Sequence, residues 1–183
     1  ELIEILAYVS ENSLSNEQID KWVDRALEKV ELASFKFRDF NTLSGGEQKR
    51  VLLAKCMVQL DCCQKSDVNQ YLFLDEPTAS LDVQQQYKLL AQVKDLAKDR
   101  RVGILAILHD INLASQIADE ILMMKDGKIM AQGSPWEIIK APILKDVLGI
   151  DTWIQRHPVW DCPYITYLPH PMAQDNKSFN STY

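Results

Sequence analysis

The sequence predicts an α/β fold, in which a parallel sheet with flanking helices is accompanied by a helical subdomain. "YLFLDEP" at 71–77 and "RVGILAILHD" at 101–110 are short apolar runs of the kind found in strands covered on both faces, and the helical stretch 83–98 separates them. A strand, a helix and a strand in that order are typical of a parallel sheet. Helical periodicity in the first 40 residues predicts the separate helical region.

The helical region has one clear start signal. Ser15 and Gln18 form a candidate capping box just before the stretch "IDKWVDRALEKV". The apolar residues of that stretch share one helical face: Ile19, Trp22, Val23, Ala26, Leu27 and Val30. The pattern is that of an amphipathic helix.

The second half of the chain predicts shorter elements. "ADEILMMKDGKIMAQG" reads as two strands around an Asp126-Gly127 turn, and "SPWE" at 134–137 starts a helix with Ser134 at the N-cap. From Asp151 on, prolines and aromatics crowd together, which indicates irregular strands or a sheet edge. The last ten residues are typical of a frayed terminus.

Composition narrows the classes of function. With 46% hydrophobic residues, a chain of 183 residues can bury a substantial core. The formal net charge of -6 gives no general attraction for nucleic acid or anionic lipid, so neither is an expected partner. The longest apolar runs are far shorter than a bilayer span, which predicts no direct membrane insertion. Four cysteines without C-x-x-C spacing favour a reducing compartment.

"NTLSGGEQKR" at 41–50 places Gly45 and Gly46 in the first turn of a predicted helix. Ser44 can cap this helix and Glu47 can complete a capping box. A cap alone does not explain the glycines, because each costs about 1 kcal/mol relative to alanine in a helix. Bare backbone N–H groups at the positive end of a helix suit an anion, most simply a phosphoryl group. The stretch therefore predicts a phosphate contact.

Asp75 and Glu76 end the first apolar strand, at the edge where open α/β sheets bind their ligands. Two adjacent carboxylates repel each other and the aliphatic strand offers no counter-charge, so a metal ion is the expected compensation. Successive strand residues face opposite ways, so one carboxylate can serve Mg²⁺ while the other polarises a water molecule. Two solvated loop carboxylates are the alternative for this pair taken alone.

These motifs resemble those of ATP-binding-cassette (ABC) ATPases. Residues 43–48, LSGGEQ, resemble the signature motif of that family. In register behind it, "YLFLDEP" resembles the Walker B element, "TASLD" at 78–82 the D-loop, and "LHD" at 108–110 the switch region. The D-loop departs from the common Ser-Ala-Leu-Asp form, because Ala79 and Ser80 are transposed, and Ser80 has no assigned role. The resemblance covers essentially the whole chain and implies a partial P-loop NTPase fold.

The resemblance implies a role for each matching residue. Asp75 would hold Mg²⁺, and Glu76 would be the general base that orients the attacking water. His109 would contact the γ-phosphate of ATP, although a histidine at a strand end, taken alone, is more often structural. The resemblance also assigns five residues to nucleotide binding: Ser44, Gly45, Gly46, Gln48 and Asp82. Of these, Asp82 would lie at the contact between two cassettes.

The Walker A loop of the family, G-x-x-x-x-G-K-[ST], does not occur in this sequence. The only Gly-Lys pair, Gly127-Lys128, has Leu122 in place of the first glycine and Ile129 in place of Ser or Thr. We interpret the chain as the back part of a cassette. Residues 1–62 would form a helical subdomain ending in the signature helix, 63–150 the distal half of the ATPase core, and 151–183 a C-terminal extension.

In this family two cassettes dimerise head to tail, so the signature of one copy meets ATP held by the Walker A loop of the other. The resemblance therefore implies a second copy of the ATPase and membrane permease subunits as partners, at the cytoplasmic face of the bacterial inner membrane. Because the phosphate cradle is missing, we expect the 183 residues alone not to hydrolyse ATP.

The cargo is predicted from two stretches. "DCCQKSDVNQ" at 61–70 and "IQRHPVWDCPYITYLP" at 154–169 resemble bacterial haem-import ATPases. Siderophore, cobalamin and metal importers share most of these features and remain alternatives for the cargo. A non-transport cassette is a further alternative, but the sequence has neither the heptads nor the basic stretch that would support it. A catalytically silent dimerisation module is the last alternative. A metal cluster of His157, Cys162 and His170 is disfavoured because its spacing lacks a zinc pattern.

Overall fold

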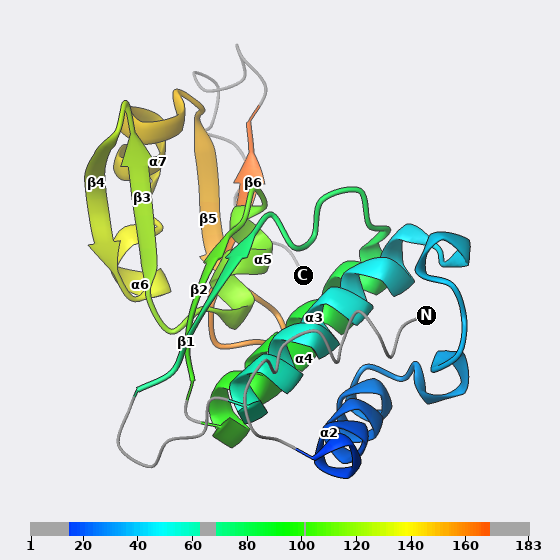
Figure 1. Ribbon diagram of the computed structural model, residues 1–183. Helices are drawn as coiled ribbons and strands as arrows, with labels where there is room; N and C mark the ends of the chain where they lie inside the picture. Colours follow the sequence, from blue (N-terminus) through cyan, green and yellow to red (C-terminus); the bar gives the residue numbers. More distant parts are fainter. Residues whose placement is uncertain (1–14, 63–68, 101, 169–183) are drawn as a thin grey trace. The chain divides into compact units, whose positions relative to one another are not determined.

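A computed structural model describes residues 15–62, 69–100 and 102–168, which belong to two compact units, 1–108 and 109–183 (Figure 1). The described part of the first unit holds three long helices and two parallel strands. The described part of the second holds two β-hairpins and three short helices. The division falls between Leu108 and His109, so the expected functional boundaries after residues 62 and 150 stay a prediction.

Helix α2 (Asn16–Lys29) begins where the sequence predicts. Ser15 is its N-cap, and the Ser15 side chain accepts a hydrogen bond from the backbone N–H of Gln18 at 3.4 Å. Ile19 and Trp22 are partly buried against the core. The rest of the predicted face is fully buried, namely Val23, Ala26, Leu27 and Val30. The helical pattern of residues 1–14 lies outside the described residues.

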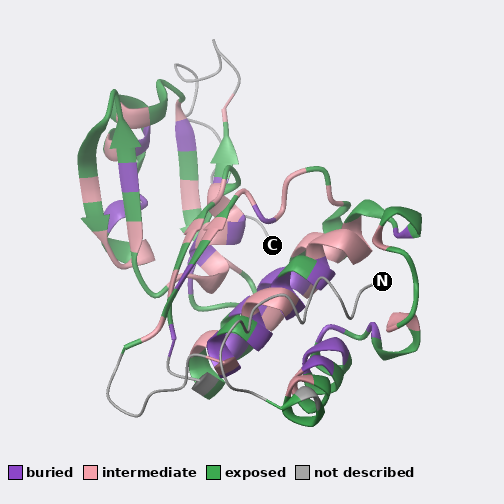
Figure 2. Ribbon diagram, in the orientation of Figure 1, coloured by how far each residue is buried: buried purple, intermediate pink, exposed green. Residues whose placement is uncertain are grey.

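Helix α3 (Gly45–Cys62) follows two short 3-10 helices, Ala33–Phe35 and Phe40–Thr42. It packs against α2, and buried residues run along its length (Figure 2). These residues form one hydrophobic core with residues of α2, the first strand and α4. The signature helix is therefore anchored in the centre of the first unit.

Strands β1 (Tyr71–Asp75) and β2 (Gly103–Ile107) are parallel, and α4 (Val83–Arg100) connects them. The register runs from Tyr71 opposite Gly103 to Asp75 opposite Ile107. Gly103 leaves room for the Tyr71 ring, because an added Cβ would lie 2.7 Å from it and the ring would have to move. The predicted strand, helix and strand of a parallel sheet are confirmed.

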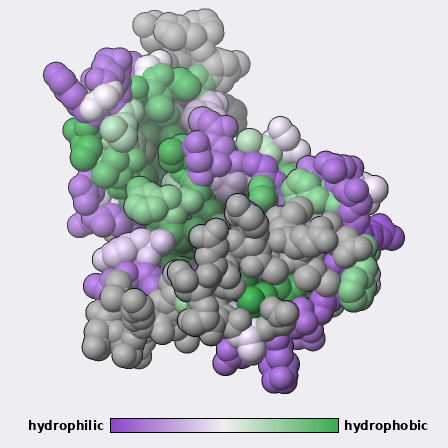
Figure 3. Space-filling view, in the orientation of Figure 1, coloured by the Kyte–Doolittle hydropathy of each residue, from purple (hydrophilic) through white to green (hydrophobic). Residues whose placement is uncertain are grey.

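Only one face of this sheet is covered in the described part of the chain. Leu72 is buried, and Leu74 and Ile104 are partly buried against the core. The opposite face exposes large apolar side chains: Tyr71 (65%), Phe73 (73%), Leu105 (58%) and Ile107 (54%). Apolar side chains accordingly appear at the molecular surface (Figure 3). Burial on both faces was therefore wrong for these residues, because the core formed with α3 and α4 lies on one side only.

The C-terminal end of α2 is tied to α4 by three polar contacts. Lys29 Nζ lies 2.6 Å from Asp99 Oδ2, and Lys88 Nζ lies 2.5 Å from Glu31 Oε2. The Gln92 side chain donates a hydrogen bond to the carbonyl oxygen of Lys29 at 3.2 Å. These contacts fix the end of α2 against the helix that connects the two strands.

The second unit contains the predicted Asp-Gly hairpin. Strands β3 (Ile121–Lys125) and β4 (Lys128–Gly133) are antiparallel, and Asp126 and Gly127 both have positive φ, 50° and 73°. Two positive φ values at the tip are those of a type I′ turn, which matches the twist of the strands. The hairpin prediction is confirmed.

Short helices surround the hairpins of the second unit: α5 (Ile111–Ile117), α6 (Pro135–Ile138) and α7 (Ala141–Leu148). As the sequence predicts, Ser134 caps α6, because its N–H and Oγ donate hydrogen bonds to the Glu137 carboxylate at 2.8 and 2.7 Å. Met123, Leu144 and Ile165 belong to the core of this unit.

Residues 151–168 form a regular hairpin rather than irregular strands. Strands β5 (Thr152–Arg156) and β6 (Pro163–Tyr167) are antiparallel, and Pro163 is the first residue of β6, where the missing N–H disturbs the ladder least. The side chain of Asn112 in α5 donates a hydrogen bond to the carbonyl oxygen of Ile165 at 3.0 Å and accepts one from its N–H at 2.7 Å.

No helix in the described ranges has the length and apolar character needed to cross a membrane.

Candidate functional site

The turn before α3 is built as a capping box. The Glu47 carboxylate accepts hydrogen bonds from the Ser44 N–H and from Ser44 Oγ, both at 2.7 Å. In return, the Glu47 N–H donates to Ser44 Oγ at 3.4 Å. Ser44 and Gly45 are exposed, so the start of α3 is open to an approaching group.

Electrostatics reinforce this turn. The pKa of Glu47 is lowered, first by the hydrogen bond from the Ser44 hydroxyl and then by that from the Ser44 backbone. The positive charges of Arg50 and Arg38 lower it further. Glu47 is therefore held in its charged form at neutral pH, next to the exposed helix start.

The two glycines of the turn have different surroundings. A Cβ added to Gly46 would lie 3.3 Å from Oε1 of Gln85, which is tighter than ordinary contact. A Cβ added to Gly45 would meet nothing within 4 Å. The glycine at 46 is explained by a neighbour within the chain, whereas the glycine at 45 borders open space.

Gln48, predicted to bind nucleotide, has a structural contact. Its side-chain amide donates a hydrogen bond to the carbonyl oxygen of Phe40 at 3.2 Å. This bond fixes the 3-10 turn that precedes the signature motif. A contact of Gln48 with nucleotide stays a prediction.

The predicted magnesium ligand Asp75 and the predicted general base Glu76 lie at the carboxyl end of β1. Asp75 is the last residue of the strand and is exposed. Glu76 follows it with φ of 45°, in the left-handed region that non-glycine residues rarely adopt. The Glu76 carbonyl oxygen accepts hydrogen bonds from Lys49 Nζ at 3.4 Å and from the Ala79 N–H at 3.1 Å. Such a backbone costs about 1–3 kcal/mol and is found most often at functional sites.

The donor set at the end of β1 fits Mg²⁺. This ion is held in proteins by one or two carboxylates, and phosphate oxygens and water complete its octahedron. Asp75 and Glu76 supply two adjacent carboxylates at a strand end. The described residues contain no group of three or more His, Cys, Asp or Glu side chains that could hold a metal ion by themselves.

Asp82 lies just before α4 and caps that helix. Its Oδ1 accepts a hydrogen bond from the Gln85 N–H at 2.8 Å, and its carbonyl oxygen accepts one from the Gln86 N–H at 2.9 Å. Asp82 is exposed, so its second carboxylate oxygen can face a partner. The D-loop aspartate thus has at least a capping role.

The structure brings the signature turn, Asp75, Glu76 and Asp82 together in the first unit. His109 is exposed and comes two residues after the end of β2, as the first residue of the second unit. Its predicted contact with the γ-phosphate stays a prediction.

Sequence reasoning missed three residues that link these motifs: Lys49, Arg50 and Gln85. Lys49 bonds the Glu76 carbonyl, and Arg50 Nη1 donates a hydrogen bond to Gln85 Oε1. Arg50 follows Gly46 by four positions, so both share one face of α3, but Gln85 lies 35 positions beyond Arg50 and no local spacing indicated this link.

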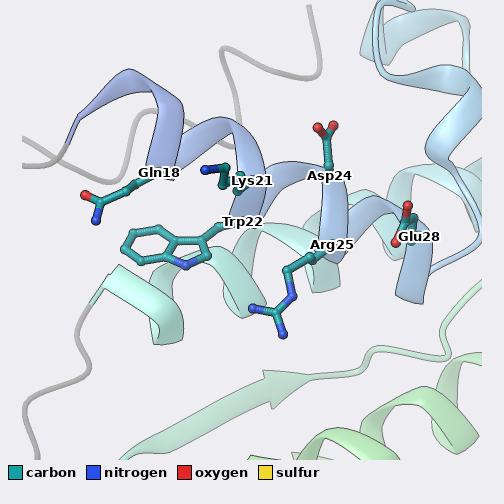
Figure 4. A pocket seen from close by; sticks show the side chains of 6 residues that line it. All are labelled: Gln18, Lys21, Trp22, Asp24, Arg25 and Glu28. Atoms are coloured by element: carbon teal, nitrogen blue, oxygen red, sulfur yellow. The ribbon is translucent and has the colours of Figure 1, made fainter.

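Two surface hollows do not form a nucleotide pocket. One, of about 420 Å³, is lined by six residues of α2, and Figure 4 shows their side chains pointing in different directions. The other, of about 130 Å³, lies between α3, β1 and α4, beside Asp75 and Cys56. It falls below the roughly 300 Å³ usual for ligand pockets.

Comparison with protein families gives one match: a model described as ABC transporter covers residues 3–79. The hemin import ATP-binding protein of Rhodopseudomonas palustris is 43% identical over 133 residues, which cover 73% of this chain and 51% of that protein. The hemin import ATP-binding protein of Rhizobium meliloti is 38% identical over 142 residues, covering 78% of this chain and 54% of that protein. The chain spans about half the length of these curated relatives.

Solved structures share the fold. A metal-chelate type ABC transporter in an inward-facing conformation matches 91% of this chain and 65% of its own, with a TM-score of 0.75 and 19% identity. A dimeric ATP-binding cassette, MJ0796, in a post-hydrolysis state with ADP and Pi bound, matches 70% of this chain and 52% of its own, with a TM-score of 0.57 and 26% identity.

Proposed function

The chain belongs to the ABC transporter family, and from this premise we propose that the protein containing it is the ATP-hydrolysing subunit of a bacterial haem importer. The observation that carries the proposal is the helix start at Gly45, which is exposed and has no described heavy atom within 4 Å of the position that a Cβ would take. A capped helix start with open space beside its first glycine suits a phosphate brought by another molecule. The carboxylates that would act on ATP lie in the same unit.

ATP is the proposed substrate, and it binds between two copies of the protein. The signature turn of one copy meets the terminal phosphate of ATP held by the other, through the N–H groups at Ser44 and Gly45. Within its own copy, Asp75 would hold Mg²⁺, which supplies positive charge to the phosphate oxygens when bound. Glu76 orients the attacking water and accepts its proton. The carbonyl contact with Lys49 holds the backbone of Glu76 while this occurs.

Charge placement supports this assignment of roles. The Glu47 carboxylate occupies both donors of Ser44, at 2.7 Å each. A phosphate that approaches Ser44 must displace or share these hydrogen bonds, whereas Gly45 is exposed and an added Cβ there would meet nothing within 4 Å. These observations support Gly45 as the first phosphate contact in our proposal, with Ser44 joining once Glu47 moves.

Haem is proposed as the cargo because the curated relatives described above are named hemin import proteins. Coupling runs through a membrane permease, so the protein works at the cytoplasmic face of the inner membrane. Binding of ATP closes the dimer and hydrolysis reopens it, and this movement drives the permease. Siderophore, cobalamin and metal importers remain the competing cargo classes.

The test uses the full-length protein together with its permease, reconstituted in proteoliposomes. We expect ATP hydrolysis that haem stimulates and cobalamin does not, and that the Glu76→Gln variant abolishes. Stimulation by cobalamin alone would overturn the cargo. Hydrolysis that persists in Glu76→Gln would overturn the assignment of the general base.

A further inference from the structure

We propose that Arg50 is a positioning residue which, through Gln85, joins the signature turn to Asp82, so that both reach the ATP of a neighbouring copy as one rigid piece. The inference rests on the proposed function, in which the signature turn meets the partner's nucleotide, and on the expected place of Asp82 at the contact between two copies. Neither Arg50 nor Gln85 belongs to the motifs that identify the family here.

Arg50 is a charged side chain in an unusual place. It is only 8% exposed, and Nη1 donates to the neutral Gln85 Oε1. Within the described ranges, its buried Nε has no hydrogen-bond partner. Among the described residues, Arg50 has no ion pair and acts on the Glu47 carboxylate only through its charge. A buried guanidinium without a bonded carboxylate is costly, and replacing such groups by apolar residues is often neutral or stabilising. Stability alone therefore does not explain arginine at this position.

Gln85 is the point where the motifs meet. Its Oε1 accepts from Arg50 on the signature helix, while its backbone N–H donates to Asp82 Oδ1 at 2.8 Å. The same Oε1 would lie 3.3 Å from a Cβ on Gly46. The Gln85 side chain thus bonds the signature helix and occupies the space where a side chain on Gly46 would lie, and its backbone holds the D-loop aspartate.

The link has a mechanical consequence. Gly46 and Gln85 are separated by 39 positions in the chain and are brought near each other by the packing of α3 and α4, while the bond from Arg50 fixes the Gln85 side chain beside the turn. Without that bond, the Gln85 side chain can turn away, and the first turn of α3 and the start of α4 lose this polar link. Hydrolysis at an interface between two copies needs both motifs in place together, because a misplacement of about 1 Å can lower the rate by about a hundredfold.

Arg38 provides a matched control. Like Arg50, it carries a positive charge that lowers the pKa of Glu47. Its guanidinium instead lies 4.2 Å from the centre of the Phe35 ring, and Arg38 is exposed. Arg38→Met removes the same charge from the neighbourhood of the same carboxylate without touching Gln85.

The experiment measures ATP hydrolysis by the full-length protein carrying Arg50→Met, Gln85→Met, both together, Gln85→Glu or Arg38→Met. We expect each methionine variant at 50 or 85 to lower kcat about tenfold or more, with KM for ATP changed less than about twofold. The double variant should fall no further than the worse single variant, because both remove one interaction. Gln85→Glu keeps an acceptor for Arg50 and Arg38→Met leaves the bond intact, so both should retain wild-type kcat.

Amide hydrogen exchange of the same proteins without nucleotide reports the link directly. Exchange at residues 44–47 and 78–82 should rise together, about tenfold or more, in Arg50→Met and in Gln85→Met. If exchange rises only beside the substituted residue, or if the two losses of kcat multiply, the inference is overturned. If the wild-type protein hydrolyses no ATP, the proposed function fails, while the exchange result still decides whether the link exists. Should Arg50→Met not fold, Gln85→Met decides both readouts.

Discussion

Replacing Gly45 with alanine separates the two reasons for a glycine at the start of a helix. The space beside Gly45 is empty to 4 Å, and its φ is not in the left-handed region, so a methyl group fits without strain. Alanine at such a position stabilises a protein by about 0.4–1 kcal/mol, chiefly by restricting the unfolded chain. For a protein of this size, that corresponds to a rise in Tm of about 1–4 °C.

The same methyl group would occupy the space that we assign to phosphate. Alanine keeps its own N–H, but the methyl group would hold the phosphate away from the helix start, and loss of one donor to a developing charge lowers kcat by about 10²–10³-fold. Gly45→Ala is thus expected to make the full-length protein more stable and nearly inactive. Few substitutions are expected to move these two quantities in opposite directions by so much.

Gly46→Ala is the matched control. Its Cβ would lie 3.3 Å from Gln85 Oε1, so the glutamine must shift by a few tenths of an ångström. We expect a lower Tm for this variant rather than a higher one. Thermal unfolding followed by circular dichroism, together with a phosphate-release assay, measures both effects. If Gly45→Ala hydrolyses ATP at the wild-type rate, the phosphate contact assigned to this turn is wrong.

Three further predictions concern other features of the chain. Hydrogen bonds from Ser44 lower the pKa of Glu47 below its ordinary 4.5. The capping box therefore stabilises the fold above pH 4.5, and this stabilisation is lost as the pH falls through the lowered pKa of Glu47. Ser44→Ala should therefore lower the free energy of unfolding by about 1 kcal/mol at pH 7. Near pH 3, the difference in free energy of unfolding between this variant and the wild type should be smaller, as acid-unfolding titrations can measure. The 183-residue chain alone should show no ATP hydrolysis, since its sequence has no G-x-x-x-x-G-K-[ST] loop, and turnover that Glu76→Gln abolishes would contradict this. Burial raises the pKa of the Cys56 thiol, so its labelling by a maleimide at pH 7 should be slow in the folded chain and faster in urea; equal rates would show that Cys56 is not protected.

Local features of this fold were readable from the sequence because their causes are local. The caps at Ser15, Ser44 and Ser134 each depend on a residue three positions away, and the structure contains all three. The parallel pairing of β1 with β2 followed from two apolar runs and the helix between them. Such patterns need no knowledge of tertiary contacts.

Features that depend on tertiary packing were not readable. Gln85 meets Arg50 and Gly46 only because α3 and α4 are packed in one core, and no local spacing predicts that meeting. The apolar run of β1 indicated burial on both faces, yet Phe73 is 73% exposed. An apolar strand is suited to burial on both faces, but whether each face is buried depends on which other elements pack against it. The positive φ of Glu76 likewise has no sequence signal.

Helix α2 is held in two ways, by ion pairs at one end and by apolar packing along its length. The contacts of Lys29 and Glu31 with α4 lie at its C-terminus. Its 14 residues span about 21 Å, so a tilt of about 10° around that end would displace the N-terminal end by about 4 Å. Such a tilt would keep the two ion pairs but would pull Ile19 and Trp22 away from the core, so the apolar packing opposes it.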